Sequence, residues 1–112
     1  MLESLASHLE RYMDLVSFRQ KLVSSNIANA DTPGYTTKDV DFQAELSSAS
    51  EGISPNVVEL NALPAKTDGN NVSLDRESRM LAENALRFSV ASHLVRAQLQ
   101  AVRSAIQNGR NG

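Results

Sequence analysis

The sequence predicts a mainly α-helical protein, in which long N-terminal and C-terminal helices pack as an antiparallel helical hairpin or coiled coil. Three observations predict this fold. The 112-residue chain has only three Phe, two Tyr and no Trp, so Leu and Ala supply most of its apolar content, as is typical of helices that contact helices. Gly and Pro are absent from residues 2–30 and 74–108. Apolar residues in both stretches recur at alternating spacings of three and four.

The N-terminal helix is predicted over residues 1–30. Among the positions of this helix that are spaced alternately three and four apart, the only polar residues are Arg19 and Asn26. Two interpretations of these interruptions stay open: the series turns toward solvent there, or the polar side chains fix register and partner choice. A second apolar stripe lies beside the first and consists of Leu15, Phe18 and Leu22.

The middle of the chain, residues 31–72, is predicted to be irregular, because it contains all three Pro and three of the five Gly. Residues 47–55 have the small, polar composition of a linker. The dipeptide Asp68-Gly69 is a turn signal and predicts a short β-hairpin between residues 57–60 and 72–74.

The C-terminal helix is predicted over residues 73–112, with Ser73 or Asp75 as its N-cap and Asn108-Gly109 as its stop. It also has a second apolar stripe: Leu86, Val90, Leu94 and Ala97. One partner helix covers only one stripe, so the remaining stripes predict self-association or assembly with similar helices.

We assign an assembly seam to apolar residues of both helices that follow the three-and-four spacing. The assembly seam consists of Leu5, Leu9, Val16, Val23, Leu81, Phe88, Val95, Leu99, Val102 and Ile106.

The sequence predicts no catalytic, cofactor-binding or metal site, and hence no enzyme and no small-molecule ligand. The chain has no Cys, and His8 and His93 lie on separate helices without a metal-binding partner one turn away. It contains neither a glycine-rich phosphate loop nor a G-x-S-x-G turn. We interpret Asp39 and Asp41 as solvated loop acids. The net charge of −2 argues against nucleic acid as a partner.

The segment after the N-terminal helix is a well-marked helix stop. Pro33 cannot continue a helix, and Gly34 can adopt the positive φ of a Pro-Gly turn. Asn26 and Asn29 can bond the backbone where the helix ends. The aromatic residues that follow, Tyr35 and Phe42, are expected to anchor the segment on the helices.

Residues 25–35, SNIANADTPGY, resemble the N-terminal signature of flagellar basal-body rod and hook proteins. Residues 38–42, KDVDF, are most similar to the proximal rod subunits of that family, as are residues 68–77, 83–88 and 103–106. The signature residues are Ser25, Asn26, Ile27, Ala28, Asn29, Asp31, Thr32, Pro33, Gly34 and Tyr35.

This resemblance implies a structural subunit that polymerises through its terminal helices into the periplasmic rod of the bacterial flagellar basal body. It implies export by the flagellar type III apparatus without cleavage of a signal peptide. The implied partners are other copies of the chain, other rod proteins, and membrane-ring and export-gate components. Phe42 and Leu46 resemble the short motif by which early rod substrates engage the export gate, although core packing explains Phe42 equally well.

Two other interpretations stay open. Another rod or hook axial protein would differ in a larger middle domain and in the residues after Tyr35. A soluble helical-hairpin adaptor or chaperone that oligomerises into a four-helix bundle would use the same apolar stripes. That second class of protein would not need the T-P-G-Y residues of the signature.

Overall fold

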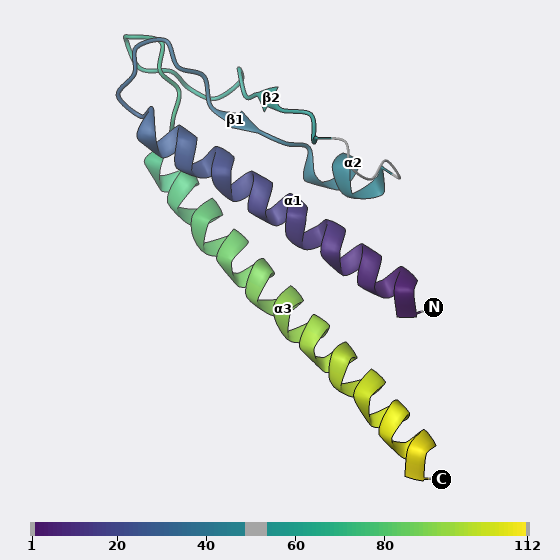
Figure 1. The fold of residues 1–112 in the computed structure, drawn as a ribbon. Coiled ribbons are helices and arrows are strands. Elements are labelled where there is room, and N and C mark those ends of the chain that lie inside the picture. Colours follow the sequence, from purple (N-terminus) through teal and green to yellow (C-terminus); the bar gives the residue numbers. More distant parts are fainter. Residues whose placement is uncertain (1, 49–53, 112) are drawn as a thin grey trace.

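A computed structural model describes residues 2–48 and 54–111, and most of the predicted linker at 47–55 lies outside them. The elements in chain order are α1 (Leu2–Ala28), β1 (Lys38–Asp39), α2 (Phe42–Ser47), β2 (Val58–Glu59) and α3 (Leu74–Asn111). As predicted, the fold is mainly helical, and the long helices α1 and α3 pack antiparallel, with the two chain ends at the same end of the molecule (Figure 1). The radius of gyration is 18.7 Å, whereas a compact domain of this size would have roughly 13 Å.

Helix α1 is the central element of the fold. Helix α3 packs along one side of it, and β1 and α2 lie on the other side (Figure 1). Arg11 of α1 fastens α2 in place, because its Nη2 donates a hydrogen bond to the carbonyl oxygen of Glu45 at 2.6 Å. Helix α1 therefore contacts all of the other elements except β2.

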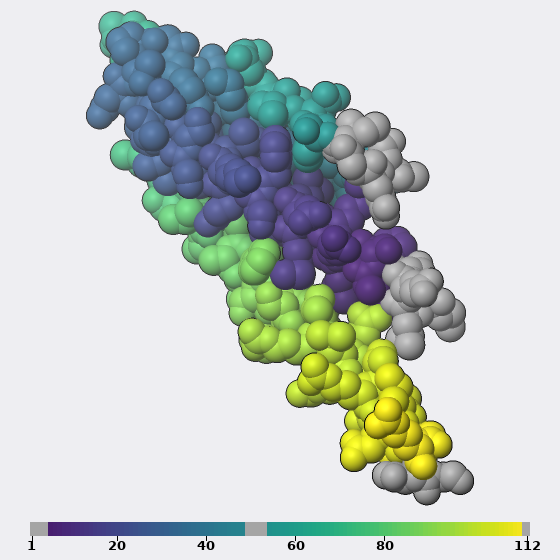
Figure 2. Space-filling view, in the orientation of Figure 1, coloured from purple at the N-terminus to yellow at the C-terminus, as the bar shows by residue number. Residues whose placement is uncertain are grey.

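The buried apolar residues are confined to the half of the molecule near the loops. They are Leu15, Val16, Val23, Val40 and Ala91. Toward the chain ends α1 and α3 diverge (Figure 1), and large apolar residues of α3 such as Leu94 and Leu99 are each 52 % exposed. The C-terminal end of α3 also projects beyond the start of α1 (Figure 2). The helix pair is thus a fork, closed by a core at one end and open at the other.

The sheet in the middle segment is not the predicted one. The prediction joined residues 57–60 to 72–74, but β1 pairs antiparallel with β2, in the register Lys38 to Glu59 and Asp39 to Val58. The turn at Gly69 does form, with φ +85° and its N–H bonded to the Lys66 carbonyl oxygen at 2.9 Å. Its arms do not pair as a hairpin, because Asn71 bonds residues 35 and 37 and the chain then enters α3.

Local side-chain hydrogen bonds explain where α3 and the short helix α2 begin. The backbone N–H of Arg76 bonds the Ser73 hydroxyl at 3.2 Å, as expected of an N-cap at Ser73. The predicted stop at Asn108-Gly109 is wrong, because α3 continues to Asn111 and Gly109 has no positive φ. One helical Gly costs only about 1 kcal/mol, which a 38-residue helix can tolerate. Asp41 caps α2 through a 3.2 Å bond from the Ala44 N–H.

Candidate functional site

The side chain of Asn26 is completely buried and makes every hydrogen bond that its amide allows. Its Nδ2 donates to the carbonyl oxygen of Lys38 at 2.8 Å and to Oε1 of Glu77. Its Oδ1 accepts from the Lys38 N–H and from the Tyr35 hydroxyl, both at 3.0 Å. One amide on α1 therefore pairs with both backbone groups of a β1 residue, as a neighbouring strand would, and also reaches α3.

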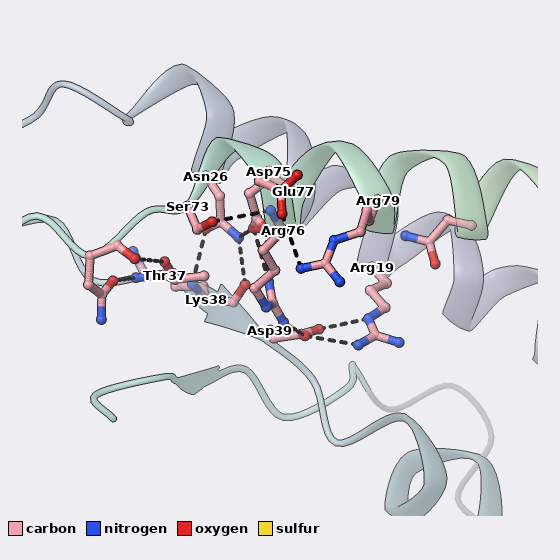
Figure 3. A network of polar contacts seen from close by, with 12 residues as sticks. Arg19, Asn26, Thr37, Lys38, Asp39, Ser73, Asp75, Arg76, Glu77 and Arg79 are labelled. Atoms are coloured by element: carbon pink, nitrogen blue, oxygen red, sulfur yellow. Dashed lines mark hydrogen bonds and ion pairs between the residues drawn. The ribbon is translucent and has the colours of Figure 1, made fainter. Parts of the chain in front are cut away.

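Four charged residues continue from Asn26 in an alternating chain, drawn in Figure 3. The guanidinium of Arg19 donates two hydrogen bonds of 2.9 Å, from Nε and Nη2, to the carboxylate of Asp39. Arg76 donates from Nη2 to Asp39 at 2.6 Å and from Nη1 to Glu77 at 2.8 Å. The order Arg19, Asp39, Arg76, Glu77 alternates in sign and sums to zero. We call these four residues and Asn26 the polar junction.

Asp39 is the most connected carboxylate of the polar junction. Burial by itself raises the pKa of Asp39, but the hydrogen bond and charge of Arg19, the Val40 N–H and Arg76 together outweigh it and lower the pKa below the usual value. The prediction that Asp39 is a solvated loop acid is therefore wrong, since only 6 % of the residue is exposed. Asp41, by contrast, is exposed.

Two further buried asparagines tie the loops together next to the polar junction. Asn70 donates from Nδ2 to the carbonyl oxygens of Asn29 and Thr32, at 2.9 and 2.8 Å, where α1 has just ended. Asn71 accepts the Thr37 N–H at 2.7 Å and donates to the Leu60 carbonyl oxygen at 2.7 Å. Both side chains thus take the place of backbone partners that these irregular segments lack.

The signature residues after α1 form a compact turn against the 66–70 loop. Gly34 has φ +73°, as the sequence predicted, and its N–H bonds the Asp68 carbonyl oxygen at 2.9 Å. Asn29 donates from Nδ2 to the Ser25 carbonyl oxygen at 2.8 Å, as expected near a helix end. Pro33 and Thr32 are exposed at the tip. The remaining signature residues before the turn, Ser25, Ile27 and Ala28, are exposed on the last turn of α1.

Phe42, the first residue that resembles the export motif, is surrounded by one aromatic ring and two guanidinium groups. Its ring meets Tyr12 edge-on, with the ring centroids 5.6 Å apart. The guanidinium carbons of Arg87 and Arg19 lie 5.1 and 5.7 Å from its centroid. Phe42 is therefore half-buried between α1 and α3, and Leu46, one turn later, is also half-buried.

The assembly seam residues divide between the two ends of the fork. Val16 and Val23 are buried at the closed end. Leu9, Val95 and Val102 are half-buried. The others are exposed by 39–58 %: Leu5, Leu81, Phe88, Leu99 and Ile106. The packing of α1 on α3 within one chain thus buries few of them fully.

Sequence reasoning missed most of the polar junction. It singled out Arg19 and Asn26 as interruptions of an apolar series, and the structure directs both of them inward. It did not connect them to Asp39, Arg76 or Glu77. The available signal was the pair of polar residues within an otherwise apolar stripe, which is costly unless both find buried partners.

Within residues 2–48 and 54–111, no group of three or more His, Asp or Glu side chains is arranged to hold a metal ion. No described helix combines the length and the apolar content that crossing a membrane needs. The polar junction connects α1, β1 and α3 at the closed end of the fork.

Comparison with known proteins finds relatives along most of the chain. Residues 16–36 match the family model described as flagella basal body rod protein. The chain is 31 % identical to the flagellar basal body rod protein FlgB of Yersinia enterocolitica, over 87 % of this chain and 89 % of the relative. It is 32 % identical to FlgB of Cereibacter sphaeroides, over 80 % and 83 %. It is 29 % identical to FlgB of Escherichia coli, over 87 % and 88 %.

Replacing Asn26 tests how much the polar junction contributes to stability. We expect Asn26→Ala to lower the free energy of unfolding by about 3 kcal/mol, since it leaves the Lys38 N–H and carbonyl without their partner and takes one hydrogen bond from the buried Glu77. Urea denaturation followed by circular dichroism measures the change. Asn61→Ala is the matched control, because that side chain is exposed, and it should change stability by less than about 0.5 kcal/mol.

The lowered pKa of Asp39 leads us to expect that the free energy of unfolding falls in acid. Its pKa is lowered in the folded chain, so its stabilisation is complete above the ordinary Asp pKa of about 3.9 and is lost as pH falls through the lower folded value. Asp39→Asn should cost about 3 kcal/mol at pH 7 and flatten the fall in unfolding free energy below about pH 4. The exposed Asp31→Asn variant should keep the wild-type slope, and an unchanged slope in Asp39→Asn would contradict the assignment.

Proposed function

The chain belongs to the flagellar basal body rod protein family, and from this premise we propose that its two terminal helices pack against those of neighbouring subunits to build the proximal rod. It is a structural component of the flagellar basal body rod. The proposal goes further than this family membership, because it assigns the assembly to particular faces of α1 and α3.

The exposed apolar faces of α3 are the observation that supports this assembly. Leu86 is 66 % exposed and Leu94 is 52 % exposed, whereas Ala91 is 2 % exposed. At 3.6 residues per turn, Leu86 lies about 140° and Leu94 about 60° around the helix from Ala91. Ile106, near the projecting end, is 58 % exposed. Contiguous apolar surface of this kind on a soluble chain marks an interface. Because these faces are distinct, they favour contact with more than one neighbour.

The parts of the chain take different roles in this proposal. Residues 1–30 and 73–112 form the rod core, and residues 31–72 form a segment carried on its outer side. The polar junction holds the signature turn at the closed end of the fork, so the angle between α1 and α3 is set before any neighbour binds. The residues of the assembly seam that are exposed at the open end then meet other subunits.

The same proposal includes partners outside the rod core. We infer contacts with other rod proteins, with membrane-ring components and with the export gate, after export by the type III apparatus without signal cleavage. Phe42 and Leu46 are one turn apart on α2 and both are half-buried. In the folded chain they are held near α1, so an export gate would reach them only before α2 packs on that helix.

A complementation experiment tests the assembly proposal. The gene should restore motility to a strain that lacks it, and Leu86→Glu/Leu94→Glu should abolish motility, because two charges would enter an interface between subunits. Both side chains are exposed in the single chain, so the purified variant should keep wild-type helicity by circular dichroism. Soft-agar swimming and electron microscopy of basal bodies provide the measurements.

The matched control is Ser78→Glu/Gln100→Glu, which adds the same charges at exposed polar positions of the same helix. This control should swim like the wild type. A deletion strain that is itself motile would sink the proposal, and so would full motility of the Leu86→Glu/Leu94→Glu variant.

A further inference from the structure

The open end of the fork contains a groove that no part of the described chain fills. Its volume is about 620 Å³, and it lies between the first half of α1 and the second half of α3. Its apolar lining comes mainly from Ala6, Met13, Phe88, Val95, Leu99 and Val102. A groove of this size between two diverging helices can accept the side chains of a third helix.

The charges in this groove are all of one sign. Glu10 and Asp14 line its α1 wall, and no Lys or Arg is among the lining residues. Neither carboxylate forms an ion pair within the described residues. The nearby cation Arg11 is directed to α2, where it bonds the Glu45 carbonyl oxygen. An occupant of this groove therefore has to bring apolar side chains and positive charge.

The last part of α3 has this combination. No acidic residue follows Glu83, whereas Arg96, Arg103 and Arg110 recur every seven residues. Residues seven apart differ by only about 20° around a helix, so the three arginines form one stripe. All three are exposed, and Ile106, next to the stripe, is 58 % exposed.

This stripe cannot serve the groove of its own chain. Ala91 is 2 % exposed and marks the line along which α3 faces α1. At 3.6 residues per turn, the three arginines lie about 100–140° around the helix from Ala91. They lie to one side of that line, and the end of α3 that carries Arg103 and Arg110 projects beyond the start of α1 (Figure 2).

We propose that the projecting end of α3 from one copy, residues 103–110, docks in the groove of a second copy. Arg103 and Arg110 then pair with Glu10 and Asp14 of the second copy, and Ile106 enters its apolar lining. The contact joins two different surfaces, so it leaves a free groove and a free end on each pair and extends into an open assembly. This inference rests on the proposed assembly function and names one of its interfaces.

Charge reversal on the purified full-length chain tests the docking. At low salt, where surface charges are least screened, sedimentation equilibrium of the wild type should show an average mass that rises above 12.2 kDa with concentration. Glu10→Lys/Asp14→Lys and Arg103→Glu/Arg110→Glu should each weaken association by about tenfold or more, because each places like charges in contact. Circular dichroism checks that both variants keep their helices.

Rescue separates direct pairing from a general effect of charge. A chain carrying all four reversals has complementary charges again and should associate within about threefold of the wild type. Mixing the two double variants should also restore association, since each then finds its opposite. The matched control for Arg103→Glu/Arg110→Glu is Lys21→Glu/Arg79→Glu, which makes the same change in net charge at exposed positions outside the groove, and it should associate like the wild type.

Three results would overturn the docking: a wild-type chain that stays monomeric at its highest soluble concentration, double variants that associate normally, or a fourfold variant without rescue. The complementation experiment distinguishes this failure from failure of the proposed function. If the gene restores motility while charge reversal has no effect on association, the chain builds the rod through another interface. If the deletion strain swims without the gene, the assembly function itself is wrong.

Discussion

The four hydrogen bonds of the buried Asn26 amide are the constraint on which the other packing depends. They hold the last turns of α1, the backbone of Lys38 in β1 and the first turn of α3 through Glu77. Without the amide, the backbone groups of Lys38 would lose their partner, and the buried Glu77 would keep only its bond to Arg76. The Tyr35 hydroxyl joins the same amide, which gives a physical reason for Asn and Tyr to occur together in one short signature.

Asparagine substitutes for regular secondary structure throughout this end of the molecule. The strands β1 and β2 have two residues each, so a sheet alone satisfies few backbone groups. The side chains of Asn26, Asn70 and Asn71 satisfy several others, because a carboxamide has the donor and acceptor geometry of a peptide group. A chain with few aromatic residues thereby obtains a closed end held by polar contacts, and many of its large apolar residues on α3 stay exposed.

The parts of the structure that depend on residues close together in the sequence could be predicted, and those that depend on distant residues could not. The long helices were predictable, because a three-and-four spacing depends on neighbouring residues only. The hairpin was wrong, because the Asp68-Gly69 turn is local but the long-range bonds of Asn71 decide what pairs with its arms. The ion pairs of Asp39 join residues 20 and 37 positions away, and no spacing rule in a single sequence reveals that they meet. The roles given to the signature and to the assembly seam stay predictions.

The central claim is that one end of the fork is complete in the single chain and that the other is completed by neighbours. Hydrogen exchange of backbone amides in the monomer and in the assembled rod measures this directly. The account predicts strong protection in the monomer for residues 15–28 and 74–91, weak protection for residues 5–14 and 95–110, and strong protection of both regions after assembly. Uniform protection along α1 and α3 in the monomer, or no gain at the open end on assembly, would contradict it.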